Sequence, residues 1–270
     1  MNEKLSISLR GVPETLLITL YHRAQESQRP DAMLKDAKAE AIVRKLDYDF
    51  SRIKLQKHDI IGLVCRVREF DCFTRDFLAA HPDGVVVHLG CGLDTRFDRV
   101  DNGRVEWFDL DLPEVIALRR QLIGDEGGRY HLLACSALDT AWIKQVKPLR
   151  PRPFLFIAEG VLPYFEKEQV KWLVQTLRST FPAADMVFDA HTPWVMHADN
   201  FQLIFSNLDA RMRFSLRHGH EVENWGEGIR MVEEWHYFGT DEPRLRPYRF
   251  MHAIPFLRKS IGIFHYRLGA

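Results

Sequence analysis

The sequence is poor in cysteine and has no cysteine pair at the spacing of a zinc or redox motif. Its four cysteines are scattered through 270 residues: Cys65, Cys72, Cys91 and Cys135. A disulfide framework is not expected in a chain of this size. The histidine pair His218 and His220 has no third ligand beside it. We therefore expect reduced thiols and no metal site.

The chain also lacks a net charge, a long apolar run and internal repeats. Lys plus Arg and Asp plus Glu each number 37, so no long-range field attracts nucleic acid or an anionic membrane. No apolar run reaches membrane-spanning length, and the first residues contain no apolar signal-peptide segment. These absences predict a cytoplasmic protein that binds neither nucleic acid nor membrane. We separately expect a monomer or homodimer.

The composition does provide for a large core, because 46% of the residues are hydrophobic. The first eighty residues show helical patterns, over Thr15–Gln25, Asp36–Leu46 and Asp59–Ala80, and the breaker His81–Gly84 follows. We expect a helical extension or cap over residues 1–80 and one compact domain over residues 81–270.

Beyond the breaker, short apolar segments alternate with helical ones. The expected strands are Val85–Leu89, Val105–Leu110, Tyr130–Ala134, Phe154–Ala158 and Met186–Ala190. The expected helices are Leu112–Leu122 and Lys167–Thr180. This alternation predicts an α/β fold, a Rossmann-like parallel sheet with helices on both faces.

The pattern after the fifth expected strand is less regular. A helical pattern over residues 193–224 predicts an insertion at about 193–232, above the binding edge of the sheet. Two further strands are expected around Glu234–Phe238 and Gly262–Arg267.

A Gly-x-Gly turn, Gly90 to Gly92, directly follows the first expected strand. Glycine lets the backbone turn tightly and approach a ligand. Asp109 and Asp111 end the next strand, and Asp111 lies 21 positions after Gly90, the offset at which a carboxylate binds ribose hydroxyls. Thr95 occupies the third glycine position of a dinucleotide site. The absence of this third glycine favours a nucleoside ligand without phosphates, such as S-adenosylmethionine (SAM), over a nicotinamide dinucleotide. The alternative is a plain turn between strand and helix that binds no ligand.

Several collinear segments resemble the leucine carboxyl methyltransferase family, including its tetracenomycin-type polyketide O-methyltransferase branch. They are VVVHLGCGLDTRF with WFDLDLPEVIALRR, and DAKAEAIVRKLDYDFS, CRVREFDCFTRDFL and PFLFIAEGVLPYF. The resemblance covers most of the chain. It implies a class I SAM-dependent methyltransferase fold for residues 81–270.

The resemblance implies a set of cofactor-binding residues. Arg66 matches the arginine that pairs with the SAM carboxylate, a task suited to the two parallel hydrogen bonds of a guanidinium. Gly90 and Gly92 lie beneath the methionine part of SAM. Asp111 binds the ribose, with Asp109 as the second choice. Glu159 faces the cofactor and holds the α-amino group or stabilises the sulfonium region.

The adenine end departs from the family pattern. The family string Asp-Leu-Arg-Asp is replaced here by Ser136-Ala137-Leu138-Asp139, so Ser136 and Ala137 stand where adenine contacts are expected. A serine accepts the adenine amino group more weakly than an aspartate. Asp94 is a further cofactor candidate, although Asp94 and Arg96 also fit a local ion pair that stabilises the turn.

The resemblance implies O-methylation of a small-molecule, polyketide-like acceptor. A carboxylate acceptor needs no general base, whereas a hydroxyl acceptor requires one within hydrogen-bond reach. Asp189 and His191, beside the end of the fifth strand, are the base candidates, and Tyr164 of the Glu-Gly-x-x-x-Tyr motif is the third catalytic candidate. The alternatives are a protein C-terminal carboxyl methyltransferase, a SAM-binding protein without catalysis, and a nicotinamide-dependent oxidoreductase.

Overall fold

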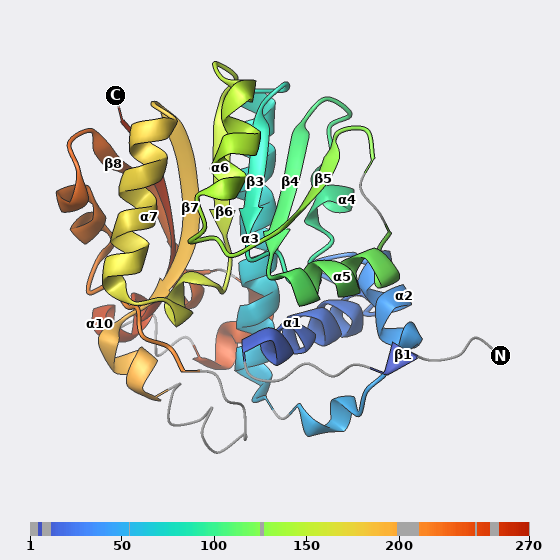
Figure 1. Ribbon diagram of the computed structural model, residues 1–270. Helices are drawn as coiled ribbons and strands as arrows, with labels where there is room; N and C mark the ends of the chain where they lie inside the picture. Colours follow the sequence, from blue (N-terminus) through green and yellow to red (C-terminus); the bar gives the residue numbers. More distant parts are fainter. Residues whose placement is uncertain are drawn as a thin grey trace.

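A seven-stranded sheet forms the centre of the molecule in a computed structural model (Figure 1). The model describes residues 5–6, 12–53, 55–124, 127–198, 211–240, 242–248 and 254–269. The strands are β3 (Val85–Leu89), β4 (Glu106–Asp111), β5 (Tyr130–Ala134), β6 (Phe154–Ala158), β7 (Ala184–His191), β8 (Ile229–His236) and β9 (Ile261–Leu268). Their order is β5-β4-β3-β6-β7-β9-β8.

The first five strands of this sheet are parallel, and β9 is antiparallel to both of its neighbours. The chain continues from β3 to β4 on one side, and β6 and β7 are added on the other. The carboxyl ends of β3 and β6 therefore flank a topological switch point, where open α/β sheets bind ligands.

The main helices are α1 (Val12–Ser27), α2 (Ala37–Lys45), α3 (Lys57–Ala80), α4 (Arg96–Val100), α5 (Pro113–Leu122), α6 (Ala141–Val146), α7 (Lys167–Thr180) and α10 (Pro255–Arg258). A two-residue parallel pair joins β1 (Leu5–Ser6) to β2 (Leu46–Asp47). No helix among the described residues combines the length and apolar composition needed to cross a membrane.

Helices cover both faces of the sheet. On one face, Phe70 and Phe77 of α3 pack against Val86 and Trp107, while α6 and α7 cover the other face. Every residue of β3 and β6 is buried, which agrees with their unbroken apolar sequences.

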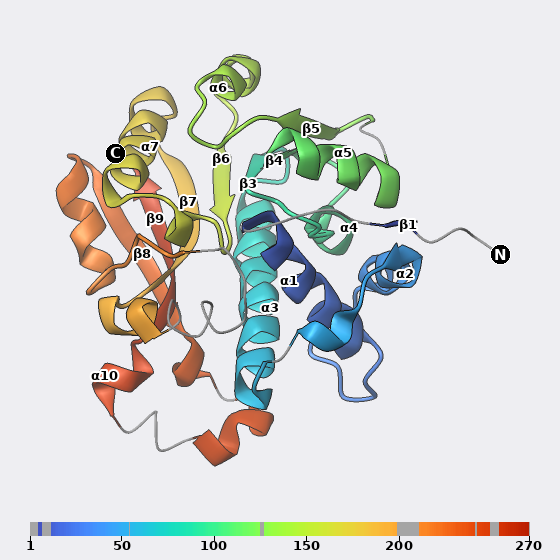
Figure 2. The ribbon, with the colours of Figure 1, turned by 60° about the horizontal axis from the view of Figure 1, so that its bottom comes forward.

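The N-terminal helices lie at the carboxyl edge of the sheet. Leu17 and Leu20 of α1 and Ile42 of α2 form one apolar cluster with Leu93 and with Leu118 of α5. Figure 2 shows α1 beside α3, near the end of β3. The division into a cap over 1–80 and a domain over 81–270 stays a prediction, and α3 packs as a layer of the sheet structure.

The five expected parallel strands and the two helices between them are present within about two residues of their predicted ends. The prediction for β8 was wrong, because the strand begins at Ile229 rather than Glu234. A register shift between Met231 and Glu233 interrupts its alternation of side chains, which hides the strand in the sequence.

The insertion expected over residues 193–232 is only partly helical. Residues 193–198 are helical, residues 199–210 lie outside the described part, and residues 211–216 have no regular structure. A 3-10 helix, η4 (Gly219–Trp225), precedes β8. Three short elements that the sequence did not predict connect β8 to β9: η5 (Tyr237–Gly239), η6 (Pro243–Tyr248) and α10.

Candidate active site

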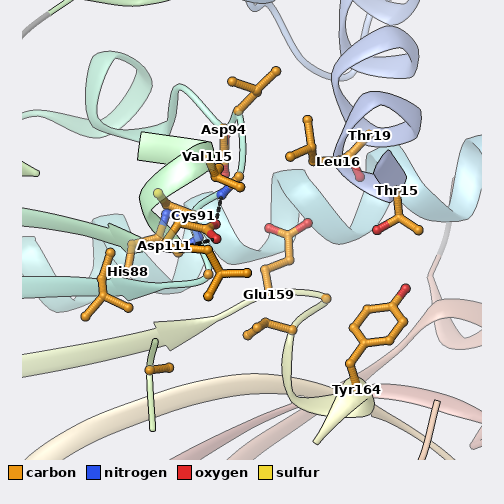
Figure 3. Close-up of a pocket in the computed structure, with 18 of the residues that line it drawn as sticks. Thr15, Leu16, Thr19, His88, Cys91, Asp94, Asp111, Val115, Glu159 and Tyr164 are labelled. Atoms are coloured by element: carbon orange, nitrogen blue, oxygen red, sulfur yellow. Dashed lines mark hydrogen bonds between the residues drawn. The ribbon is translucent and has the colours of Figure 1, made fainter. Parts of the chain in front are cut away.

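A pocket opens at the carboxyl ends of β3, β4 and β6, beneath α1 (Figure 3). In this view Asp111 and Cys91 stand on one side, Thr15 and Tyr164 stand on the other, and Glu159 projects between them. The expected site residues that line the pocket are Arg66, Gly90, Gly92, Asp94, Asp111, Ser136, Ala137, Glu159 and Tyr164.

The glycine turn after β3 adopts positive φ angles, 67° at Gly90 and 50° at Gly92. A Cβ atom on Gly90 would lie 2.6 Å from Val161 Cγ2, so only glycine lets this turn contact the loop after β6. The amide groups of Gly90 and Cys91 donate to the carbonyl oxygen of Leu110, 2.8 and 3.0 Å away. The turn is thereby joined to β4.

Asp111 is held at the end of β4 by two backbone amides. Its carboxylate accepts from the Gly92 and Leu112 N–H groups, both at 2.7 Å. Burial raises the pKa of this carboxyl group, although both hydrogen bonds oppose the shift. A carboxylate in this position can accept from the adjacent hydroxyls of a ribose.

Asp109 does not line the pocket, which disagrees with its expected role as a second ribose ligand. Its carboxylate pairs with Arg119 and accepts from the hydroxyl of Tyr130 and the indole of Trp107, both at 2.7 Å. Asp109 lies two residues before the end of β4 and is bound by these partners, whereas Asp111 is the last residue of the strand and lines the pocket.

Arg66 connects three elements at the floor of the pocket. Its Nε donates to Glu159 Oε1 at 3.0 Å, and its Nη1 donates to Asp189 Oδ2 at 3.1 Å. Asp189 Oδ1 also accepts from the Gly160 amide at 2.7 Å. The planar guanidinium of Arg66 is therefore fixed by carboxylates at the ends of β6 and within β7.

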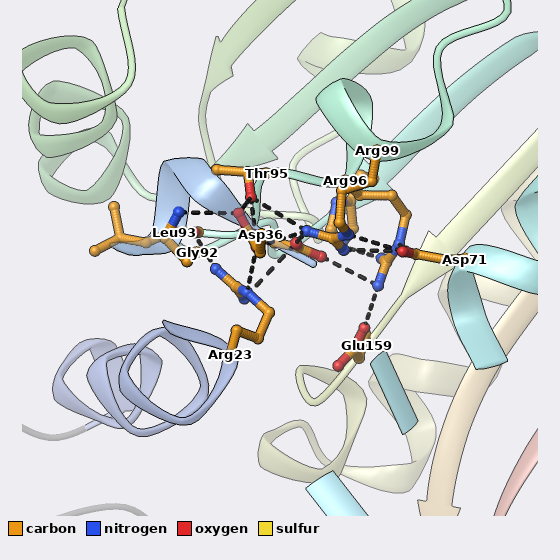
Figure 4. Close-up of polar contacts among 12 residues, drawn as sticks. Arg23, Asp36, Asp71, Gly92, Leu93, Thr95, Arg96, Arg99 and Glu159 are labelled. Carbon is orange, nitrogen blue, oxygen red and sulfur yellow. Dashed lines mark hydrogen bonds and ion pairs between the residues drawn. The ribbon is translucent and has the colours of Figure 1, made fainter. Parts of the chain in front are cut away.

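A network of buried ion pairs surrounds this floor (Figure 4). Arg96 contacts Glu159 Oε2 at 2.5 Å, Asp94 Oδ2 at 3.1 Å and Asp71 Oδ1 at 2.8 Å. The network continues through three further residues, Arg23, Asp36 and Arg99. Burial alone would raise the pKa of Asp94, but the arginines around it outweigh burial and hold that pKa well below its usual range.

The part of the pocket where the resemblance implies adenine contacts follows β5. Ser136 and Ala137 line it, as the resemblance implied. Ser136 Oγ accepts from the Leu138 amide at 3.2 Å, and the exposed Asp139 accepts from Ala141 at the start of α6. The serine thus stabilises the local turn while facing the pocket.

The three catalytic candidates do not come together. Tyr164 lines the pocket, but His191 and Asp189 are not among the lining residues. Asp189 is fully buried, and its two oxygens accept from Arg66 and Gly160. His191 is buried at the end of β7, where its backbone pairs with Ile261. The structure therefore gives no support to these two residues as bases.

The sequence reasoning missed the wall formed by α1, which consists of Thr15, Leu16, Thr19 and Arg23. Thr15, Thr19 and Arg23 recur every four positions, which places them on one face of the helix, and this stripe was the available signal. The pocket residues that were also missed include His88, Cys91, Val115, Cys135, Val161 and Phe165.

Comparisons with known proteins agree with this geometry. The leucine carboxyl methyltransferase family model matches residues 16–178. The tetracenomycin polyketide synthesis O-methyltransferase TcmP of Streptomyces glaucescens is 36% identical over 231 residues, which cover 85% of this chain and 84% of TcmP. The SAM-dependent methyltransferase dpfgK of Gibberella zeae is 34% identical over 66% of this chain and 64% of its own length.

Solved structures share the fold. A DUF574-family protein of Streptomyces avermitilis superposes with a TM-score of 0.59 at 15% identity, over 92% of this chain and 96% of its own. A methyltransferase candidate from Thermobifida fusca superposes with a TM-score of 0.57 at 18% identity, over 92% of this chain and 94% of its own. The strand order, the pocket at the switch point and the sequence matches together show that the chain belongs to the leucine carboxyl methyltransferase family and is a SAM-dependent methyltransferase.

Proposed function

We propose that this enzyme transfers the methyl group of SAM to a carboxylate oxygen of a small-molecule acceptor. SAM supplies an electrophilic methyl group on a sulfonium. The protein contributes orientation, because holding the reacting atoms in line supplies several kcal/mol of the barrier reduction, on the order of 7 in favourable cases.

The pocket residues fit SAM by their chemistry. Asp111 offers an oriented carboxylate for the ribose, and Ser136 and Ala137 offer a surface for adenine. Asp94 Oδ1 is buried and pairs with Arg99 Nη1 at 2.9 Å, so this acid is held by the arginines of the protein itself. The guanidinium of Arg66 suits the carboxylate of SAM.

One observation carries the choice of a carboxylate acceptor: the acids that line the described part of the pocket already have partners. Asp94 and Glu159 are paired with arginines, and Asp111 accepts two backbone amides. A carboxylate that binds an arginine in a buried site is a poor proton acceptor, because protonation would leave the arginine charge uncompensated.

His88 also lines the pocket, but both of its ring nitrogens face partners. Nε2 lies 3.4 Å from Arg96 Nη1, and Nδ1 lies 3.5 Å from Asp109 Oδ1. With Nε2 beside a cation and Nδ1 beside a carboxylate, the favoured tautomer directs the Nε2 lone pair to Arg96. A hydroxyl acceptor would need a proton acceptor that these residues do not offer, whereas a carboxylate arrives ionised.

The small-molecule class rests on the likeness to TcmP, whose name links it to polyketide synthesis. Tyr164 and Phe165, on the side of the pocket beside Val161, offer aromatic surface to such an acceptor. The C-terminal carboxylate of a protein is the second candidate, because the matching family is named for a leucine carboxyl group.

The test is transfer of radiolabelled methyl from SAM to three kinds of probe. These are polycyclic aromatic carboxylic acids, matched phenols and a peptide that ends in leucine. We expect labelling of the aromatic acids, and mild base should release the label as methanol because the product is an ester. Base-stable label on the phenols would refute the carboxylate acceptor, and label on the peptide would favour the second candidate. SAM binding with no transfer to any of the three probes would refute these acceptor classes, the proposed one included.

A further inference from the structure

The glycine turn of the pocket is held by arginines from two different helices. Arg119 Nη1, from α5, donates to the carbonyl oxygens of Gly92 at 2.7 Å and Asp94 at 2.8 Å. Arg23 Nη2, from α1, donates to the carbonyl oxygen of Leu93 at 2.7 Å (Figure 4). Three consecutive carbonyl groups of the turn are thus fixed by buried side chains.

The two glycines of the turn differ in what restrains them. Gly90 is restrained sterically, because Val161 occupies the space that a Cβ atom would take. A Cβ atom on Gly92 would meet nothing nearer than Leu16 Cβ at 3.4 Å, so packing leaves this residue room to rotate. Glycine populates many backbone conformations, and a turn that depends on one of them needs hydrogen bonds to select it.

Gly92 also connects this turn to Asp111. Its amide donates to Asp111 Oδ2, while its carbonyl oxygen accepts from Arg119. If the bond from Arg119 to the Gly92 carbonyl group is lost, the backbone can rotate at Gly92. That rotation would break the bond from the Gly92 amide to Asp111. The direction of the Asp111 carboxylate therefore depends on the contact between Arg119 and the turn.

Arg119 is itself anchored on the side away from the pocket. It is 1% exposed, it pairs with Asp109, and its Nη2 donates to the Tyr130 hydroxyl at 2.8 Å. Trp107 Nε1 fixes Asp109 from β4. Asp109, which does not line the pocket, thus acts on the turn through Arg119.

We infer that Arg119 is a positioning residue for SAM, which selects the conformation of Gly92 and thereby orients Asp111 toward the ribose. The inference rests on the proposed placement of SAM in this pocket. It assigns Asp109, Arg119 and Gly92 to one path that runs from the core of the sheet to the cofactor.

The test is SAM binding by calorimetry to Arg119→Lys. Lysine keeps the positive charge beside Asp109, but its single nitrogen cannot also bond to the carbonyl oxygens of Gly92 and Asp94. We expect SAM to bind at least about tenfold more weakly, the equivalent of about 1.4 kcal/mol or one lost hydrogen bond. Without SAM, backbone hydrogen exchange should accelerate in the peptide over residues 88–97 and stay unchanged in β6 and β7.

A variant of the neighbouring residue on α5 serves as the matched control. Arg120→Lys alters the exposed neighbour on α5 and should change nothing. Asp109→Asn weakens the anchor while leaving Arg119 in place, so it should weaken SAM binding even if Arg119→Lys does not fold.

Wild-type affinity in a folded Arg119→Lys or Asp109→Asn variant would overturn the inference. Accelerated exchange throughout the sheet would also overturn it, because that result means a general structural role. Failure of the wild-type protein to bind SAM would instead count against the proposed function, so the two failures are distinguishable.

Discussion

His22 is a buried base on the helix that covers the pocket. The ring is 5% exposed, its Nε2 makes no hydrogen bond to the described residues, and Tyr21 contacts its ring edge-on. Burial lowers the pKa of His22 to about 4 from 6.5. The ring is therefore neutral in the folded protein at neutral pH, because charging it would place an unpaired cation in the core.

This lowered pKa predicts a loss of stability in mild acid. The unfolded chain binds a proton at His22 near pH 6.5, and the folded chain does so only near pH 4, so the contribution is present above pH 6.5 and is lost as the pH falls toward 4. Between pH 7 and pH 5 the wild type should lose about 2 kcal/mol through this group. Urea unfolding of the wild type and His22→Gln at both pH values measures it, and equal losses in the two proteins would contradict the prediction.

Asp36 has two separable tasks, one local and one electrostatic. Its Oδ1 accepts from the Ala39 amide at 2.9 Å and caps α2. Its Oδ2 pairs with Arg23 and Arg99, each at 3.0 Å, and the three side chains are almost fully buried. The positive charges of both arginines are partly neutralised by this one carboxylate.

Asp36→Asn separates the two tasks, because asparagine caps a helix about as well as aspartate. We expect the free energy of unfolding to fall by about 3 kcal/mol, since the substitution leaves buried arginine charge uncompensated. The matched control is Asp98→Asn, which breaks the exposed pair between Asp98 and Lys38 and should cost less than about 1 kcal/mol. Equal losses in the two variants, measured by chemical denaturation, would show that burial of the pair is not decisive.

At the scale of elements, the sequence predicted what is encoded locally. The strand β3, its glycine turn and Asp111 lie within 27 residues, and their spacing alone placed them together at one edge of the sheet. The helix α5 was predicted from Pro113 and its apolar spacing. Elements whose pattern is regular and whose ends carry strong breakers were found within about two residues.

Elements without a local pattern were not found. The bulge in β8 disrupts the period of two on which a strand prediction depends, and this strand lies at the edge of the sheet with several half-buried residues. The short helices between β8 and β9 are too brief to show a period of 3.6.

The ion-pair network was beyond sequence reasoning for another reason. Arg99 and Asp36 are 63 positions apart, and Arg66 and Asp189 are 123 positions apart. No periodicity connects residues so distant, because their proximity is a result of the fold. The same cause explains why Asp189 was assigned to catalysis: its position near the end of a buried strand was visible, but its partner Arg66 was not.

At the scale of the whole molecule, the N-terminal helices take part in both the core and the site. Phe70, Phe73 and Phe77 of α3 pack on the face of the sheet that also contains Trp107 and Leu155. At the carboxyl edge, α1 supplies one wall of the pocket. The far end of α1 is tied to η6 by Glu26, which accepts from both Nη atoms of Arg244 at 3.0 Å.

This packing predicts that residues 81–270 do not fold without the preceding helices. Removing α3 would expose one face of the sheet, and each phenylalanine lost from that face forfeits about 2 kcal/mol of burial free energy. A chain that begins at His81 should show no cooperative thermal transition, because domains of this size are stable by only about 5–15 kcal/mol. A chain that begins at Val12, which removes β1 but keeps α1, is the control and should unfold cooperatively within a few degrees of the full chain. Differential scanning calorimetry distinguishes the two, and a cooperative transition in the shorter chain would show that the sheet folds independently and that α1 to α3 are a separable cap.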